Sequence, residues 1–307
     1  MAIRIGIVGL GKIAHDQHVP TLTASPDFDL VAAASQHGRL EGASNYATIE
    51  DMLAGDDRLE AVSLCQPPQA RFDAAHLALK GGKHVFLEKP PGATLSEVRV
   101  LADLARERGL SLFASWHSRH APGVEAARSW LSDRRIRAVR VEWKEDVRHW
   151  HPGQAWIWQP GGLGVFDPGI NALSIVTRIL PMPFFLREAT LSFPANRGAP
   201  IAADLAFVAP DGTPVVAAFD WRQTGPQTWD IRVETDGGVL LLSGGGKALT
   251  IDGADQPLAP EAEYRGLYDR FAALVAARRS DVDVSPLRHV ADAFLRGERK
   301  QVEPFED

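Results

Sequence analysis

The amino-acid sequence predicts an α/β fold of two domains, in which a parallel sheet is followed by an α+β domain built on an open, mainly antiparallel sheet. First, the chain has 307 residues, more than a single hydrophobic core usually supports. Second, its first third alternates short apolar runs with helical patterns, which is typical of a parallel sheet covered on both faces. Third, much of its second half alternates apolar with polar residues, as strands with one open face do.

The expected first domain covers residues 1–118. Gly81 and Gly82 supply a stop after one of its helical patterns, and Gly109 supplies a stop after the next. Strands are expected at residues 3–8, 29–34, 61–64, 84–87 and 110–114, and helices at residues 49–53, 70–80 and 95–108.

The expected second domain covers residues 119–307. Its clearest strand is 136–147, where Val139, Val141 and Trp143 alternate with charged residues. Helices are expected at 121–131, 167–180 and 286–295, and further strands at 203–208, 215–221, 230–234 and 239–242.

Composition and charge exclude several classes of protein. With 45% hydrophobic and 23% charged residues the chain is an ordinary globular protein, and its net charge of -6 argues against a nucleic-acid binder. A single cysteine, Cys65, rules out an intrachain disulfide and fits a reducing cytoplasm. We expect neither a signal peptide nor a membrane span, because no basic start precedes a long apolar run.

A glycine motif, Gly9-Leu10-Gly11-Lys12-Ile13-Ala14, follows the first expected strand directly. It has the G-x-G-x-x-A form of a dinucleotide-binding Rossmann turn, in which the first glycine permits the turn and the second admits a pyrophosphate. A plain glycine-rich turn is the alternative, but the position at the head of alternating strands and helices favours the cofactor. We therefore predict a Rossmann domain in which Gly9, Gly11, Lys12 and Ile13 bind NAD or NADP.

The end of the second expected strand bears on the choice of cofactor. NAD-selective enzymes place an acidic residue there to hold the ribose, whereas this chain has Ser35-Gln36-His37. No carboxylate repels a 2′-phosphate, but no arginine occurs in this tripeptide to clamp one. We predict that NADP is preferred and NAD tolerated, with Ser35, Gln36 and His37 in the cofactor site; a merely polar loop is the alternative.

Glu88-Lys89-Pro90-Pro91 stands at the end of the strand expected at 84–87, where ligands of open α/β sheets bind. A lysine there can exchange a proton with a substrate hydroxyl, although a surface lysine would fit the same spacing. We predict that Glu88 and Lys89 belong to the cofactor site and that Lys89 is catalytic. The tight turn predicts a cis peptide bond at Lys89–Pro90 or Pro90–Pro91.

Asp167-Pro168-Gly169-Ile170-Asn171 predicts the start of a helix, with Asp167 as its N-cap and Pro168 as its first residue. Asn171 lies four residues on, on the same face of that helix. A carboxylate and an amide so placed can grip sugar hydroxyls, so both residues are candidates for the active site. A capping role alone is the alternative for Asp167.

Aromatic and polar residues gather around residues 116–119, 145–158 and 229. Sugars commonly bind to aromatic faces and to polar side chains, so this composition favours a sugar site. The spacing of His149 and His151 could suit a metal, but no companion ligand pattern accompanies it, and no metal site is predicted. The predicted substrate-binding residues are His117, Glu145, Trp150 and Trp229.

The glycine motif, Glu88-Lys89-Pro90 and the open-sheet second half resemble the Gfo/Idh/MocA family of oxidoreductases over essentially the whole chain. The stretches 116–118, 143–146, 150–153 and 161–171 are similar to bacterial members that oxidise the anomeric carbon of L-arabinose and D-galactose to the lactone. The resemblance implies that Lys89 is the family lysine, and that Asp167 and Asn171 occupy the carboxylate and the later active-site position. Many members carry histidine where this chain has Asn171.

We therefore expect an NAD(P)-dependent aldose 1-dehydrogenase that accepts L-arabinose and D-galactose and uses D-glucose poorly. Lys89 is favoured as proton acceptor with Asp167 orienting it, and Asp167 as acceptor is the alternative. A non-catalytic sugar sensor and a reductase of another carbonyl class are the other functions considered. Family members often pair through the open sheet, so a homo-oligomer is one option; no nucleic-acid or membrane partner is expected.

Overall fold

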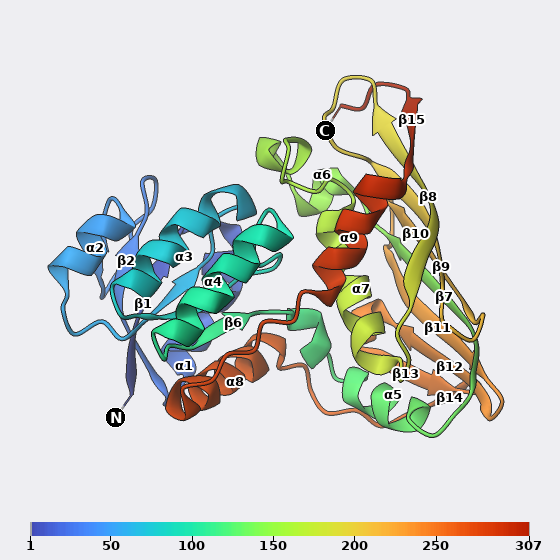
Figure 1. Cartoon of the computed structure of the whole chain (residues 1–307), viewed down its shortest axis with the longest axis horizontal. Coiled ribbons are helices and arrows are strands. Elements are labelled where there is room, and N and C mark those ends of the chain that lie inside the picture. The colour runs from blue at the N-terminus through green and yellow to red at the C-terminus, as the bar shows by residue number, and fades with distance from the viewer. Residues whose placement is uncertain (1, 307) are drawn as a thin grey trace. The chain divides into compact units, whose positions relative to one another are not determined.

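The computed structural model describes residues 2–306, which form two compact units (Figure 1). The first unit comprises the residues up to His117 together with Tyr264–Val284. The second comprises Ser118–Glu263 together with the residues from Ser285 onward. The chain therefore returns to the first unit, whereas the sequence predicted a second domain that runs on without interruption from residue 119.

Within the described residues, the first unit contains a six-stranded sheet in the order β3-β2-β1-β4-β5-β6, with every pairing parallel. The order reverses between β1 and β4, and open α/β sheets bind ligands at the carboxyl ends of strands at such a point. The parallel sheet expected from the sequence is thus confirmed. Its strands are β1 (Ile3–Val8), β2 (Phe28–Ala34), β3 (Ser44–Tyr46), β4 (Ala61–Leu64), β5 (His84–Leu87) and β6 (Leu112–Ala114).

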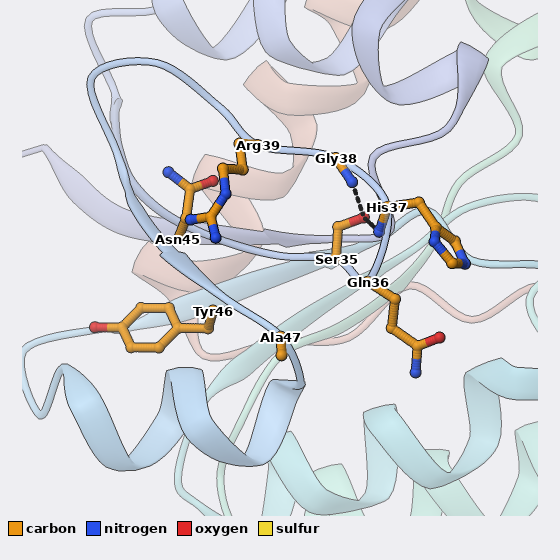
Figure 2. Close-up of a pocket in the computed structure, with 8 residues that line it drawn as sticks. All are labelled: Ser35, Gln36, His37, Gly38, Arg39, Asn45, Tyr46 and Ala47. Atoms are coloured by element: carbon orange, nitrogen blue, oxygen red, sulfur yellow. Dashed lines mark hydrogen bonds between the residues drawn. The ribbon is translucent and has the colours of Figure 1, made fainter.

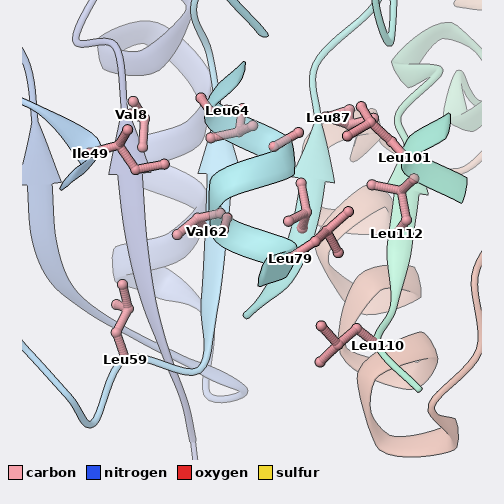
Figure 3. Close-up of a cluster of buried hydrophobic side chains, with 14 of the residues drawn as sticks. Val8, Ile49, Leu59, Val62, Leu64, Leu79, Leu87, Leu101, Leu110 and Leu112 are labelled. Atoms are coloured by element: carbon pink, nitrogen blue, oxygen red, sulfur yellow. The ribbon is translucent and has the colours of Figure 1, made fainter. Parts of the chain in front are cut away.

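Helices cover both faces of this sheet. On one face, Leu79 and Leu101 pack among strand residues such as Val62 and Leu87 (Figure 3). On the other face a largely aromatic core joins the strands to a late helix, α8 (Glu263–Ala277). The remaining helical elements are η1 (Ala14–His18), α1 (Val19–Ala24), α2 (Ile49–Gly55), η2 (Pro68–Ala70), α3 (Arg71–Lys80), α4 (Leu95–Glu107) and η3 (His117–His120), the last of which continues into the second unit.

Helix α8 explains why the chain returns. Its buried side chains recur at the three- and four-residue spacing of an amphipathic helix, a signal that the sequence analysis overlooked. Each large apolar side chain buried in such a core stabilises the fold by roughly 1.5–3 kcal/mol. The core that they complete contains Phe28, Phe86, Phe113, Tyr264, Leu267, Tyr268, Phe271 and Leu274.

The second unit is built on a sheet of nine strands among the described residues, in the order β14-β13-β12-β11-β7-β10-β9-β8-β15. Two pairings, β7 with β10 and β8 with β15, are parallel, and the others are antiparallel. The strands are β7 (Ile136–Lys144), β8 (Phe185–Pro194), β9 (Ala202–Val208), β10 (Pro214–Asp220), β11 (Thr228–Thr235), β12 (Gly238–Ser243), β13 (Ala248–Ile251), β14 (Ala254–Asp255) and β15 (Glu298–Val302).

Helices lie on one side of this second sheet (Figure 1). Helix α7 (Phe166–Ile179) is almost wholly buried, and α9 (Ser285–Arg296) packs on α7 and β8. On the other side Arg140, Asp204 and Val216 are exposed, so the predicted open, mainly antiparallel sheet is confirmed. The other helical elements are α5 (Val124–Leu131), α6 (Val147–Trp150), η4 (Ala155–Trp158) and η5 (Gly244–Gly246). None of the helices described between residues 2 and 306 has the length and apolar character needed to cross a membrane.

Candidate active site

The turn after β1 requires glycine at Gly9. Its φ is +88°, and a Cβ atom built on it would lie 3.0 Å from the backbone nitrogen of Gln66. Both the backbone conformation and the available space therefore exclude a side chain. At Gly11, apart from its chain neighbours, no atom of residues 2–306 lies within 4 Å of the position that a Cβ would take. The backbone there is open to an approaching ligand, as a pyrophosphate site requires.

The rest of the glycine motif leads into the first helical segment. Ala14 is fully buried and packs with Ile7 and Ala33, so a small side chain allows this segment to lie close to the sheet. Lys12 and Ile13 are exposed, and Lys12 forms an ion pair with Asp16. The residues present thus fit a dinucleotide at the end of β1.

A pocket of about 390 Å³ lies just after β2 and is lined by residues 35–39 and 45–47 (Figure 2). The Ser35 hydroxyl accepts hydrogen bonds from the backbone N–H groups of His37 (3.4 Å) and Gly38 (3.2 Å), which fold the chain into a turn. This turn brings Arg39 into the same pocket as Ser35, Gln36 and His37. Arg39 thus supplies the arginine that the tripeptide Ser35-Gln36-His37 lacks, and only the folded turn shows that it lies there.

Lys89 follows β5 and is half-buried, and its peptide bond with Pro90 is cis, which confirms that prediction. The backbone N–H of Lys89 donates to Oε2 of Glu88 at 2.6 Å. The buried guanidinium of Arg71 donates to the carbonyls of Glu88 and Pro90 through one nitrogen, and to that of Gln66 through the other. Two buried charged side chains thus hold the backbone around Lys89.

Glu88 lies in a buried polar network. Its Oε1 accepts from the hydroxyl of Tyr264 at 2.7 Å and lies 3.2 Å from Nε2 of His18, whose Nδ1 lies 2.6 Å from the hydroxyl of Tyr268. Burial opposes ionisation of Glu88, but the hydrogen bond and charge of His18, with the charges of His117 and Lys89, outweigh it and lower the pKa of Glu88 to about 2. Glu88 is therefore a carboxylate at neutral pH.

His117 belongs to the same unit and is half-buried. Its ring stacks on that of Tyr264, with centroids 5.6 Å apart and planes inclined by 18°. Tyr264 thus connects two of the predicted site residues, Glu88 and His117, from a helix that the sequence analysis did not predict.

In the second unit Asp167 is buried, and Nε2 of His151 lies 3.4 Å from its Oδ2. The prediction that Asp167 caps the helix was wrong. Helix α7 already begins at Phe166, and the N–H of Asp167 donates to the carbonyl of Gly164 at 2.8 Å, so Asp167 lies inside the first turn. Asn171 is half-buried, four residues further along the same helix.

Glu145 lies at the same edge of the sheet as Trp221, because the parallel strands β7 and β10 end there together. The buried carboxylate of Glu145 accepts from the indole N–H of Trp221 at 3.3 Å and from that of Trp229 at 2.8 Å. Trp229 is also in ring contact with Trp150, at a centroid distance of 5.2 Å. Three of the four predicted substrate-binding residues therefore form one cluster.

His151 joins this cluster to Asp167, since its ring lies 5.3 Å from that of Trp221. Sequence reasoning placed His151 among the aromatic and polar residues but did not select it, and it did not select Trp221 at all. The available signal was the repeated Trp and His near residue 150, but only the tertiary fold pairs them with Trp221. Among residues 2–306, no group of three or more His, Cys, Asp or Glu side chains is arranged to hold a metal ion.

Comparison with known sequences gives two matches that bear on this site. Residues 3–115 match the Gfo/Idh/MocA profile, described as an oxidoreductase family with an NAD-binding Rossmann fold. The chain is 47% identical over 305 residues to a galactose 1-dehydrogenase of Pseudomonas fluorescens, and the alignment covers 99% of each chain.

Comparison with solved structures likewise finds a galactose dehydrogenase. A D-galactose-1-dehydrogenase protein from Rhizobium etli is 61% identical, with a TM-score of 0.96, and the match covers 99% of this chain and 98% of the other. A 3-ketoreductase from Actinomadura kijaniata, solved in complex with NADP, has a TM-score of 0.85 over 98% of this chain at 20% identity, and so shares the fold.

Proposed function

Because this chain belongs to the Gfo/Idh/MocA oxidoreductase family, we propose that it is an NAD(P)-dependent dehydrogenase that oxidises C1 of D-galactose and L-arabinose to the lactone. The full-length identity of 47% to a galactose 1-dehydrogenase carries this proposal. In the reaction the sugar loses a hydride from C1 and a proton from the C1 hydroxyl. Bound NAD(P)+ supplies the hydride acceptor, and the protein supplies the proton acceptor.

Lys89 is the proposed proton acceptor. It stands just beyond β5, at the end of the sheet where ligands of such folds bind, and its side chain is half-buried. An amine at this position takes the proton of the C1 hydroxyl as the hydride leaves. Asp167 as the acceptor is the alternative, and the variants described in the Discussion separate the two.

Asp167 and His151 are proposed to act as a pair. The carboxylate fixes the orientation of the imidazole, as carboxylates do for histidines in many active sites, and the pair orients a sugar hydroxyl. Asn171, on the same helix as Asp167, is proposed to add an amide hydrogen bond to the sugar. An imidazole thus lies beside the carboxylate, although the helix of Asp167 itself carries an amide, Asn171, one turn further on.

The aromatic cluster is the proposed sugar-binding surface. Trp150 and Trp229 offer large apolar faces for the C–H side of a pyranose ring, and Glu145 offers carboxylate oxygens for its hydroxyls. Because the carboxylate of Glu145 accepts from two indoles, it also fixes the orientation of the Trp229 face.

We propose that NADP is preferred and that NAD is also used. Ser35, Gln36, His37 and Arg39 line the pocket after β2, where the adenosine ribose binds in Rossmann domains. A guanidinium binds phosphate strongly and in a defined geometry, so Arg39 supports a preference for the 2′-phosphate. Gly9, Gly11, Lys12 and Ile13 would hold the pyrophosphate.

The test is reduction of NAD+ and NADP+, followed at 340 nm, with a panel of aldoses. We expect turnover with D-galactose and L-arabinose. Sugar binding without turnover would instead indicate a sensor, and a purified protein that neither binds nor oxidises any aldose would contradict the proposed substrate class.

We propose that the protein acts in the cytoplasm and that two copies of it pair. A single cysteine suits the reducing cytoplasm.

Pairing of two copies through the open face of the second sheet would cover Val216, which is 36% exposed. Light scattering of the wild type and of Val216→Glu tests the pairing: a dimer that the substitution dissociates would support it.

A further inference from the structure

The peptide groups on both sides of Lys89 are held by side chains of opposite charge. The carboxylate of Glu88 accepts the N–H of Lys89, and the guanidinium of Arg71 donates to the carbonyls of Glu88 and Pro90. Glu88 and Arg71 are only 3% and 2% exposed. Burial of a charged side chain is costly unless hydrogen bonds compensate for the lost water, so such an arrangement is not expected where an ordinary turn would suffice.

Protein donors already serve both oxygens of the Glu88 carboxylate. Oε2 accepts from Lys89, while Oε1 accepts from Tyr264 and lies within hydrogen-bond distance of His18. Burial lowers the pKa of His18, but Cys65, Tyr268 and Glu88 raise it, and the net pKa lies well above its usual value. A protonated His18 donates to Glu88 from Nε2 and to Tyr268 from Nδ1.

This network reaches across the sequence. His18 comes from the first helical segment, Ser63 from β4, and Tyr264 and Tyr268 from the returning helix α8. The Ser63 hydroxyl lies 3.0 Å from that of Tyr268 and so anchors this side chain to the sheet. The position of the Glu88 carboxylate therefore depends on a helix far along the chain, since Tyr264 lies 176 residues after Glu88.

We propose that Glu88 is a positioning residue for Lys89: its carboxylate, oriented by Tyr264 and His18, fixes the lysine backbone so that the amine is held for proton transfer. That the Lys89 amine transfers a proton rests on the proposed function. That Glu88 fixes the backbone of Lys89 does not. A displacement of about 1 Å in a catalytic group can cost on the order of a hundredfold in rate.

The first experiment compares Glu88→Gln with a matched control, Glu97→Gln. Glu97 also accepts backbone N–H groups, those of Ala93 and Thr94, but in the capping box of α4. We expect Glu88→Gln to lower kcat by roughly tenfold to a hundredfold, with KM for sugar and cofactor within about threefold of wild type. Glu97→Gln should keep kcat within about twofold. A loss of thermal stability in Glu88→Gln without a selective loss of kcat would overturn the proposal.

The second experiment reads the backbone directly, without turnover. Hydrogen exchange of the Lys89 amide, measured by mass spectrometry on peptides that end before Gly92, is informative because Pro90 and Pro91 carry no amide hydrogen. We expect this amide to exchange at least about tenfold faster in Glu88→Gln than in wild type or Glu97→Gln. Unchanged exchange contradicts the inference, whereas a wild type that oxidises no aldose contradicts the proposed function alone.

Tyr264→Phe keeps the test valid if Glu88→Gln does not fold. It removes one donor to Oε1 of Glu88 and retains the ring that stacks on His117. We expect faster exchange of the Lys89 amide and a several-fold loss of kcat at unchanged KM. If Tyr264→Phe alters neither quantity while Glu88→Gln fails to fold, Glu88 has a structural role only and the proposal is wrong.

Discussion

The Nε2 atom of His151 lies 3.4 Å from Oδ2 of Asp167, although the two residues are separated by a loop and a short helical turn. The side chains are 17% and 4% exposed, so the pair is largely shielded from water, and the second ring nitrogen, Nδ1, lies 3.3 Å from Oε1 of Gln154. Asn171 lies four residues after Asp167 on the same helix, whereas the imidazole of His151 reaches the carboxylate from another segment.

Exchange of His151 for asparagine should therefore lower kcat/KM for D-galactose by roughly tenfold to a thousandfold, because the oriented imidazole is lost. His149→Asn is the matched control. This histidine is exposed, two residues away in the same segment, and we expect kcat/KM within about threefold of wild type. If both variants lost kcat/KM to the same extent, His151 would have no specific role in the reaction.

Lys89→Ala should lower kcat by roughly a hundredfold to ten-thousandfold, the usual effect of losing an acid–base group, while the Kd of NADPH stays within about threefold. Lys80→Ala removes an exposed lysine at the end of α3 and should have no effect. Stopped-flow absorbance and NADPH fluorescence measure the two quantities. If Asp167→Asn abolished turnover while Lys89→Ala retained it, Asp167 would be the proton acceptor.

Arg39→Ala should raise KM for NADP+ by about tenfold to a hundredfold, because a charge-assisted contact to phosphate is worth roughly 1.5–3 kcal/mol. Kinetics with NAD+ provide the control within the same variant, since NAD+ lacks the 2′-phosphate. The proposed role of Arg39 would be contradicted if the wild type preferred NAD+ by a hundredfold. It would also be contradicted if Arg39→Ala raised KM equally for NADP+ and NAD+.

The strands of the first unit other than β3 were predictable because each is a short apolar run bounded by turn residues. β1, β4 and β5 have the predicted limits. β3 was missed because its three residues, Ser44–Tyr46, carry no apolar run, and the prediction did not include β8, β13, β14 or β15.

The candidate site was predictable where one segment carries the chemistry, as at Gly9 and Lys89. It was not predictable where two segments must meet. Arg39 reaches the pocket only because the Ser35 turn folds the chain back, and His151 meets Asp167 only in the tertiary structure. The capping role assigned to Asp167 failed because helix boundaries depend on backbone hydrogen bonds that the sequence does not reveal.

D-Glucose should be oxidised at least about tenfold less efficiently than D-galactose. The two sugars differ in the orientation of the C4 hydroxyl, and a buried polar group that loses its partner costs roughly 1–3 kcal/mol. L-Arabinose keeps the C2, C3 and C4 arrangement of D-galactose and should fall within about a hundredfold of it in kcat/KM. Initial-rate kinetics with all three sugars provide the test, and equal efficiency with glucose and galactose would contradict a site that reads C4.

Stability at acid pH should depend on Glu88. In the folded protein the pKa of Glu88 is lowered to about 2. Ionisation of this carboxylate therefore stabilises the fold at every pH above the pKa that Glu88 has in the unfolded chain. This stabilisation is lost as the pH falls toward the pKa that Glu88 has in the folded protein. The shift corresponds to about 3 kcal/mol at neutral pH. The difference in Tm between wild type and Glu88→Gln, measured by calorimetry from pH 7 to pH 3, should narrow as pH falls, whereas a constant difference would argue against an ionised Glu88.

The return of residues 264–284 has a consequence for biosynthesis. When a nascent chain has emerged only as far as residue 118, Phe28, Phe86 and Phe113 have been made but the side chains of α8 that cover them have not. At about 5–20 residues per second, that helix follows roughly ten to thirty seconds later. The first unit, although it begins first in the sequence, thus finishes folding after most of the second unit has been translated, and a truncated chain that stops at residue 118 should aggregate rather than fold.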